Sequence, residues 1–413
     1  MAARSTITPA PIALPGVEIE NEHGVFLMAE TSRSLATLRD GVRADDVHSA
    51  GGEPLVLAVR DGEFAEFDTA RALFIDTETT GLAGGTGTYA FLVGVGYVDG
   101  SDFTVRQYFM RDLPEEKPMM AALAELFAAH DWSVTYNGRS FDLPLLRTRF
   151  IMSRQRPRID HMGHLDLLHS ARRLWGRSPL AANGLSLGAL EAGLFEFQRP
   201  LDIPSWRIPE IYFDYLRDYD PSPLLPVLAH NIEDIVTMAA LLGVIQRALS
   251  NWEDDDLVSP YLIAGLGRTL AGMGRTRRAA RAYRRALSLG LDAESSNRVA
   301  LDLSILLKRD GDWDASVELW RRVADGRGRI AALACIELAK FYEHRARLLE
   351  SAREMCDRAS RLSAGDADYW GGQLSDWELN HREGRLRRKL AVPAVPASPS
   401  ASARPGRRFA RRT

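Results

Sequence analysis

The segment Leu73-Phe74-Ile75-Asp76-Thr77-Glu78-Thr79-Thr80-Gly81-Leu82 decides the fold. Its β-branched and aromatic residues end at a glycine turn signal, which indicates a buried strand. Side chains two residues apart project from the same face of a strand, so Asp76 and Glu78 lie side by side. Two such carboxylates repel each other and lose hydration unless a cation lies between them. Alone, the pair indicates two solvated acids at a strand end. Together with the acids further along the chain, however, the pair indicates a divalent-metal site.

The composition is that of an ordinary globular protein. The chain has 413 residues, enough for two or three domains, and 46% of them are hydrophobic. A net charge of −3 gives no overall attraction to nucleic acid or anionic membrane, so such binding must depend on local patches. The two cysteines, Cys335 and Cys356, argue against a disulfide framework and a structural zinc site. Without a signal peptide or an apolar run of roughly 20 residues, we expect a cytoplasmic protein with no membrane span.

Sequence patterns divide the chain into parts. Residues 1–70 are expected to form an N-terminal extension packed on the catalytic domain, with strand-like segments at 24–28 and 55–59. The catalytic domain is expected at 71–250, where strand and helix patterns alternate. The expected strands are 73–78, 89–98, 103–109, 133–136 and 164–168, and the expected helices are 118–130, 142–150, 185–194, 211–217 and 227–242.

Further acids follow along this domain. Asp142 opens a helix after the turn signal Asn137-Gly138, where a lone aspartate would be interpreted as an N-cap. Asp166 ends a strand, and we expect it to have a structural hydrogen-bonding role rather than to bind metal. His230 and Asp234 lie one helical turn apart and share a face. Such a pair is more often found on the surface, but its place in a domain that already holds three suitable acids favours catalysis.

Arginines are concentrated after Asp142. A cluster of this kind is usually a solvated face, but beside an acidic site it could hold a phosphodiester backbone. The cluster consists of Arg147, Arg149, Arg154, Arg156 and Arg158.

Three segments, taken together, resemble a known family. They are Phe74-Ile-Asp76-Thr-Glu78-Thr-Thr-Gly-Leu82, Tyr136-Asn137-Gly-Arg-Ser-Phe141-Asp142 and His230-Asn-Ile-Glu-Asp234. They are similar, in order, to the three exonuclease motifs of the DEDD 3′–5′ exonucleases, and the resemblance covers about residues 71–247. Segments 81–94, 164–175 and 212–217 resemble the bacterial YprB-like branch in particular. This resemblance implies an α/β ribonuclease H-like domain with a mixed central sheet flanked by helices.

The resemblance also implies a metal mechanism. Asp76, Glu78, Asp142 and Asp234 would hold two Mg²⁺ or Mn²⁺ ions, which prefer oxygen ligands. Two such ions would stabilise the attacking and leaving oxygens of an in-line displacement. His230 would orient or deprotonate the attacking water. In the family, the third motif has either a Tyr at the spacing that His230 occupies here or a His one residue further from the Asp.

The same resemblance assigns substrate contacts to three other positions. Asn137 and Phe141 would support the site and the terminal nucleotide, and Leu82 could pack against a base.

The last third of the chain has an all-helical, repeating pattern. After an acidic linker at 251–256, equivalent positions recur at spacings of 37 and 36 residues, which resembles degenerate tetratricopeptide repeats over 257–380. Such repeats would offer a concave surface to a protein partner, although a helical bundle packed on the catalytic domain is the alternative. Residues 385–413 are basic and are expected to be a disordered tail, either solubilising or in weak contact with phosphates. The repeat positions are Gly274, Gly311 and Arg347; Ala279, Ser316 and Ala352; Tyr283, Trp320 and Cys356; Ala286, Val323 and Ala359.

The sequence therefore leads to two functional hypotheses. The first is a divalent-metal-dependent 3′–5′ exonuclease that acts on a single-stranded 3′ end of DNA or RNA, with the repeats recruiting a partner. The second is a non-catalytic nucleic-acid-binding or scaffold protein that keeps the fold, and the unusual spacing of His230 and the attached repeats motivate it.

Overall fold

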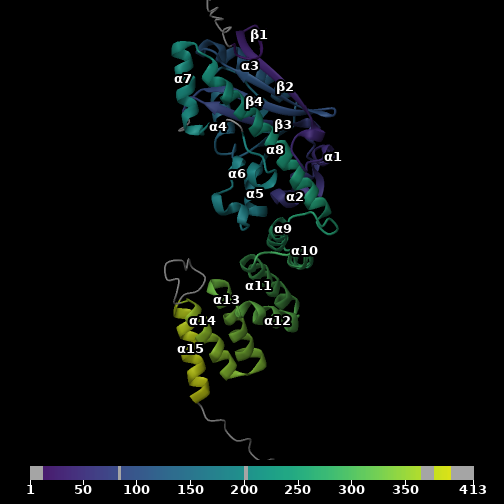
Figure 1. Cartoon of the computed structure of the whole chain (residues 1–413), viewed down its shortest axis with the longest axis vertical. Coiled ribbons are helices and arrows are strands. Elements are labelled where there is room, and N and C mark those ends of the chain that lie inside the picture. The colour runs from purple at the N-terminus through teal and green to yellow at the C-terminus, as the bar shows by residue number, and fades with distance from the viewer. Residues whose placement is uncertain (1–12, 82–84, 200–202, 364–375, 392–413) are drawn as a thin grey trace, which may run out of the picture. The chain divides into compact units, whose positions relative to one another are not determined.

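The chain forms two compact units, Met1–Leu303 and Ser304–Thr413. The first contains a β-sheet, whereas the described part of the second consists of helices and connecting turns. The computed structural model shown in Figure 1 describes residues 13–81, 85–199, 203–363 and 376–391.

Within the described residues, the first unit is built around one sheet of seven strands in the order β1-β2-β5-β4-β3-β6-β7. The strands from β1 to β3 in this order pair antiparallel, whereas β6 and β7 are added in parallel. The sheet is therefore mixed, as expected, and β3 lies inside it with a neighbour on each side. The strands are β1 (Val17–Asn21), β2 (Gly24–Ser34), β3 (Ala72–Thr79), β4 (Ala90–Asp99), β5 (Asp102–Phe109), β6 (Trp132–Thr135) and β7 (Gly163–Asp166).

The N-terminal extension contributes to this sheet. β1 and β2 form a hairpin, and β2 pairs with β5 so that Leu27 lies opposite Phe109. The strand predicted at 24–28 is confirmed as part of β2. The strand predicted at 55–59 is wrong, because these residues belong to helix α2 (Gly52–Val59), which buries Leu55. A short apolar run does not by itself distinguish a buried strand from a buried helix.

Helices cover both faces of the sheet. On one face, α8 lies against Gly94 and Gly96 of β4, where an added Cβ atom would come 2.4 Å from Ile235. On the other face, Leu73 and Ile75 of β3 share a core with α3, α4 and α7. The glycines thus allow α8 to approach the sheet closely. The bounds are α3 (Glu116–Ala128), α4 (Asp142–Met152), α7 (Ile208–Asp218) and α8 (Leu225–Asn251).

Helix α8 belongs to the core of the first unit. By length and composition alone, the segment Ser222–Asn251 could cross a membrane, with a mean hydropathy of 1.4. However, 67% of its most apolar window is buried inside the protein, and the helix packs against β3, β4 and β5. We therefore interpret α8 as the central helix of the α/β domain.

In Figure 1, α1, α2, α5, α6 and α9 lie around the lower part of α8, and α10 packs on α9. α5 packs on α9 so closely that a Cβ atom at Gly265 would lie 2.1 Å from the Leu174 carbonyl oxygen. Some of the arginines in and just before α10 form ion pairs: Arg275 and Arg278 share Glu53, Arg281 pairs with Glu253, and Arg285 pairs with Asp256. The bounds are α1 (Ala44–His48), α5 (Leu167–Trp175), α6 (Leu187–Leu194), α9 (Pro260–Gly272) and α10 (Thr276–Leu289).

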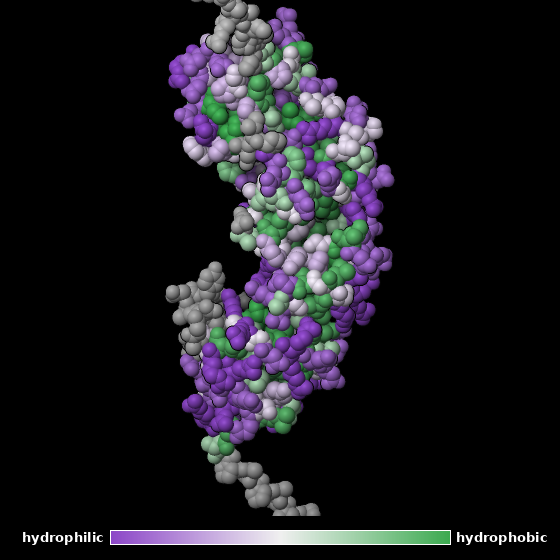
Figure 2. Space-filling model, viewed as in Figure 1, coloured by the Kyte–Doolittle hydropathy of each residue, from purple (hydrophilic) through white to green (hydrophobic). Residues whose placement is uncertain are grey.

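The second unit is helical, and its successive helices pack on one another. The fully buried Glu343, in the π-helical turn Tyr342–Ala346, pairs with Arg382, Arg385 and Lys389 of α15. On the face seen in Figure 2, α14 and α15 carry mainly hydrophilic side chains. The helices are α11 (Ala293–Asp310), which crosses the division between the units, α12 (Trp313–Ala324), α13 (Gly328–Phe341), α14 (Leu349–Ser363) and α15 (Asp376–Ala391).

The repeat positions found in the sequence are equivalent in local conformation. Gly274, Gly311 and Arg347 all have positive φ angles, of 74°, 88° and 61°, which end one helix and redirect the chain. The small and aromatic repeat positions that follow them are buried. The helical nature of this region is confirmed, while its tetratricopeptide-like character stays a prediction. Residues 385–391 of the expected tail are helical, and the rest of the tail lies outside the described residues.

Candidate active site

The first two acids project from the centre of the sheet toward α8. Asp76 and Glu78 lie on β3, and Asp76 is paired in register with Gly94 of β4. The missing side chain at Gly94 leaves room for Asn231, since a Cβ atom there would lie 2.1 Å from Asn231 Oδ1. Asn231 donates from Nδ2 to Asp76 Oδ2 at 2.7 Å. The sheet geometry and one amide of α8 together fix the Asp76 carboxylate.

Asp142 is joined to the same strand from the other side. It is the first residue of α4, and its Oδ1 accepts hydrogen bonds from Thr77 N at 3.0 Å and Thr77 Oγ1 at 2.6 Å. Because Thr77 lies between Asp76 and Glu78, these bonds place the third carboxylate beside the first two. A simple N-cap interpretation of Asp142 therefore does not describe it.

The turn before α4 is held by Asp166. Its carboxylate accepts from Asn137 N at 2.9 Å, from Arg139 N at 3.2 Å and from Leu168 N at 3.1 Å. The structural hydrogen-bonding role expected for Asp166 is confirmed. Asn137 has a positive φ of 66°, so the turn bends sharply before Asp142.

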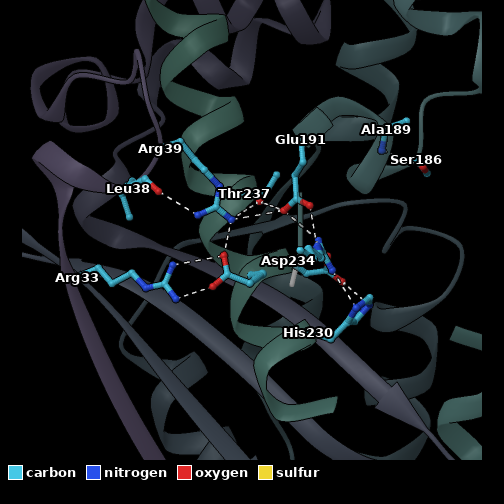
Figure 3. A network of polar contacts seen from close by, with 11 residues as sticks. Arg33, Leu38, Arg39, Ser186, Ala189, Glu191, His230, Asp234 and Thr237 are labelled. Atoms are coloured by element: carbon cyan, nitrogen blue, oxygen red, sulfur yellow. Dashed lines mark hydrogen bonds and ion pairs between the residues drawn. The ribbon is translucent and has the colours of Figure 1, made fainter. Parts of the chain in front are cut away.

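His230 and Asp234 lie on α8, where an arginine that sequence reasoning missed contacts both. Arg199 Nη1 lies 2.9 Å from His230 Nδ1, and Arg199 Nη2 donates to Asp234 Oδ1. His230 Nε2 is 3.4 Å from Asp234 Oδ2. Arg199 in turn forms a double hydrogen bond with Glu191, at 2.7 and 3.0 Å. Figure 3 shows His230 and Asp234 within this network of charged side chains.

All the predicted site residues that the structure describes line one pocket of about 790 Å³. Phe141 is the most exposed large apolar residue there, with 59% of its surface accessible. Leu82, predicted to contact a base, lies outside the described residues. The predicted residues that line the pocket are Asp76, Glu78, Asn137, Phe141, Asp142, His230 and Asp234.

The four carboxylates of the pocket all have raised pKa values. Burial, followed by the negative charges of Asp234 and Asp142, raises the pKa of Asp76 well above its usual range. Burial and the charge of Asp76 do the same to the pKa of Glu78. Burial also raises the pKa of Asp142 to about 6, although the Thr77 hydrogen bonds oppose this rise. The pKa of Asp234 is raised by burial, against the lowering effect of Arg199. Carboxylates in this state are stabilised by an added cation.

The carboxylate oxygens suit a hard divalent ion, but they do not form a complete set of metal ligands as placed. Among the described residues, no group of three or more His, Cys, Asp and Glu side chains is placed so that it could hold a metal ion. Asp234 faces Arg199, Asp76 faces Asn231 and Asp142 faces Thr77. Carboxylate oxygens are the ligands that Mg²⁺ and Mn²⁺ prefer. The residues therefore fit such ions in the chemistry of their donor atoms.

The arginine cluster after Asp142 is not one exposed patch. Arg149 is buried, with 2% of its surface accessible, and it pairs with Glu116 and donates to the carbonyl oxygen of Thr86 at 2.8 Å. Arg147 pairs with Asp160. The prediction that all five arginines share a solvated or phosphate-binding face is wrong, because helical periodicity turns Arg149 into the core. Arg154, Arg156 and Arg158 are exposed.

Two residues of the site had weak or no signals in the sequence. Asn231 follows His230 directly and lies three residues before Asp234, so its position between two predicted site residues could have marked it as a candidate. Arg199 lies in an irregular segment after α6, and no motif or periodicity marks it.

The chain is similar to known proteins in sequence and, more weakly, in structure. A model of the RNase H superfamily matches residues 73–246. The "Uncharacterized protein YprB" of Bacillus subtilis (strain 168) is 31% identical over 324 residues, which are 77% of this chain and 75% of that protein.

Two solved structures have low similarity. The family B DNA polymerase from the hyperthermophilic archaeon Pyrobaculum calidifontis matches with a TM-score of 0.34 and 15% identity, over 53% of this chain and 28% of that chain. BtubC (BKLC) from P. vanneervenii matches with a TM-score of 0.27 and 15% identity, over 48% of this chain and 94% of that chain. At these TM-scores, neither likeness bears on fold or function.

Proposed function

Because the chain belongs to the RNase H superfamily, we propose that it is a divalent-metal-dependent 3′–5′ exonuclease of the DEDD type. Its substrate is a single-stranded 3′ end of nucleic acid, from which it releases mononucleotides by phosphodiester hydrolysis. The observation that carries this proposal is the meeting of four carboxylates from β3, α4 and α8 around one pocket. Burial raises the pKa values of all four carboxylates, so further positive charge in the pocket would stabilise their ionised forms.

In this proposal, Asp76, Glu78, Asp142 and Asp234 hold two Mg²⁺ or Mn²⁺ ions. When bound, such ions stabilise negative charge on the attacking and leaving oxygens of the phosphodiester. Thr77 orients Asp142, which lines the pocket, through two hydrogen bonds to its Oδ1 atom.

The protein also supplies contacts for the nucleotide. Asp166 fixes the turn that presents Asn137 and Phe141, and the exposed ring of Phe141 offers a surface on which a base can stack. A double helix keeps its terminal bases stacked and paired, so a single-stranded end suits such a surface better. His230 lies at the pocket wall beside Asp234, where it can orient a water molecule or a phosphate oxygen.

The helical region has a separate role in the proposal. We assign it to the recruitment of a protein partner through tetratricopeptide-like repeats. The two cysteines, both free and buried, suit the cytoplasmic location that we propose.

A nuclease assay tests the proposed activity. Single-stranded RNA, single-stranded DNA and duplexes with a labelled 3′ nucleotide are incubated with Mg²⁺ or Mn²⁺, and mononucleotides are measured. The Asp76→Ala variant should lose roughly a hundredfold or more of the activity, because a carboxylate that holds the ions is gone. Asp131→Ala is the matched control, since Asp131 is an exposed acid paired with Arg71 before the start of β3. Unchanged activity in Asp76→Ala would rule out this site.

One observation favours a second candidate, a nucleic-acid-binding scaffold without catalysis. Arg199 already neutralises Asp234, and no metal-ready group of ligands is present in the described part of the chain. Calorimetry that detects no Mg²⁺ or Mn²⁺ binding, together with intact binding of oligonucleotides, would select the scaffold over the nuclease.

A further inference from the structure

Six charged side chains form an alternating chain from the edge of the molecule into the pocket (Figure 3). Arg39 and Arg199 each contact the acid before them and the acid after them, and Arg33 contacts the acid that follows it, so three positive and three negative charges alternate along the series. At the outer end, one third of the Arg33 side chain is exposed, whereas the inner members are buried. The order is Arg33, Glu233, Arg39, Glu191, Arg199 and Asp234.

Glu191 fixes Arg199 on the side away from the pocket residues. Its Nε and Nη2 atoms donate to the two oxygens of the Glu191 carboxylate. Glu191 is itself almost fully buried, and it is fixed by Thr237 and Arg39. A bidentate arginine–carboxylate pair of this kind is strong and directional. We therefore expect the guanidinium to stay beside His230 even if its contact with Asp234 is lost.

The same guanidinium also forms hydrogen bonds with two groups that the proposed reaction needs. Arg199 Nη2 donates to Asp234, and Nη1 donates to His230 Nδ1. A guanidinium N–H can only donate, so His230 Nδ1 must accept, and the neutral ring then carries its hydrogen on Nε2. This Nε2 is directed at Asp234, 3.4 Å away. In this arrangement His230 offers Asp234 a donor rather than offering water a base.

The other three carboxylates of the pocket have no such partner. Within the residues that the structure describes, Asp76, Glu78 and Asp142 form no ion pair with lysine or arginine. Asp234 is therefore the one acid of the four whose charge is already matched by a side chain. Arg199 donates to Asp234 Oδ1, an oxygen that an ion bound by Asp234 could also use.

We propose that Arg199 is the resident cation of this pocket and that it competes with a divalent ion for Asp234. The proposal rests on the proposed nuclease function and deepens it by naming how the site is held before the ion binds. When an ion takes Asp234, Arg199 remains on Glu191 and keeps its contact with His230 Nδ1. Arg199 is thus a positioning residue that sets the metal affinity of the site and the orientation of His230.

The test is calorimetric titration of the full-length protein with MnCl₂ at pH 8. Arg199→Gln should bind Mn²⁺ roughly tenfold more tightly than the wild type, the scale set by one charge-assisted hydrogen bond. Arg199→Lys keeps the charge but cannot bridge Glu191 and Asp234 as a fork, so its affinity should lie between the two. Arg33→Gln, at the outer end of the series, should bind Mn²⁺ as the wild type does. Circular dichroism verifies that each variant is folded.

The outcomes separate this inference from the proposed function. Equal or weaker Mn²⁺ binding by folded Arg199→Gln, with clear binding by the wild type, would overturn the inference and leave the nuclease proposal standing. If Arg199→Gln does not fold, Arg199→Lys decides, since affinity no tighter than that of the wild type would overturn the competition. Absence of Mn²⁺ binding in all variants would overturn both the inference and the metal mechanism.

Discussion

The replacement of Asp142 by asparagine should stabilise the protein in the absence of metal. Both Thr77 donors bond to Oδ1 of Asp142, and an asparagine keeps this oxygen as an acceptor. Only the second oxygen changes, from half of a negative charge to a neutral amide. The substitution therefore removes the buried charge and preserves the local hydrogen bonds.

The size and the pH dependence of this effect follow from the raised pKa. Burial raises the pKa of Asp142 from 3.8 to about 6, which corresponds to a cost of about 3 kcal/mol for keeping the ionised form in the fold. Below about pH 4 the carboxyl is protonated in both the folded and the unfolded chain, so the variant gains nothing. Between about pH 4 and pH 6 the wild type loses stability relative to the variant, and above pH 6 the difference is complete.

Calorimetric unfolding in EDTA at pH 4 and pH 8 measures this difference. Asp142→Asn should raise the unfolding midpoint by several degrees at pH 8 and leave it unchanged at pH 4. Asp142→Ala is the control, because it removes the acceptor of both Thr77 hydrogen bonds together with the charge and should gain less. An Asp142→Asn variant that is no more stable than the wild type at pH 8 would show that burial does not destabilise the ionised form of Asp142 as described.

Two further substitutions test how α8 is set on the sheet. Gly94→Ala places a Cβ atom 2.1 Å from Asn231 Oδ1. It should therefore lower the unfolding free energy by roughly 1–3 kcal/mol and reduce the proposed nuclease activity. Gly62→Ala is the control, because Gly62 has open space around it, and it should show neither effect in the same assays. Asn231→Ala removes the donor to Asp76 and the acceptor of the Gln107 amide, which should cost roughly 1–3 kcal/mol in denaturant unfolding; a loss below the error of that measurement would contradict the assigned role.

The sequence predicted correctly those features that depend on residues close together in the chain. The strand at β3, the helix that Asp142 opens and the one-turn spacing of His230 and Asp234 all follow from periodicity and turn signals, because neighbouring residues impose them. The same reasoning placed Asp166 in a hydrogen-bonding role, which its three backbone partners confirm.

Other features depend on contacts between distant segments, which periodicity does not encode. The run at 55–59 was predicted as a strand, yet it is helical because it packs on α8 and α5 rather than pairing with a strand. Arg149 was predicted to be on the surface, although Glu116, 33 residues earlier in the chain, gives it a buried partner. Arg199 has its partners on α6 and α8, and only the folded chain brings these together.

The most direct test of the central claim is a crystal structure of the protein soaked with MnCl₂, with anomalous scattering recorded for manganese. We predict anomalous peaks for manganese ions in the pocket, bound by carboxylate oxygens of Asp76, Glu78, Asp142 and Asp234, with Asp234 turned away from Arg199. A pocket without manganese at a concentration that saturates binding in solution, or manganese bound elsewhere on the chain, would contradict it.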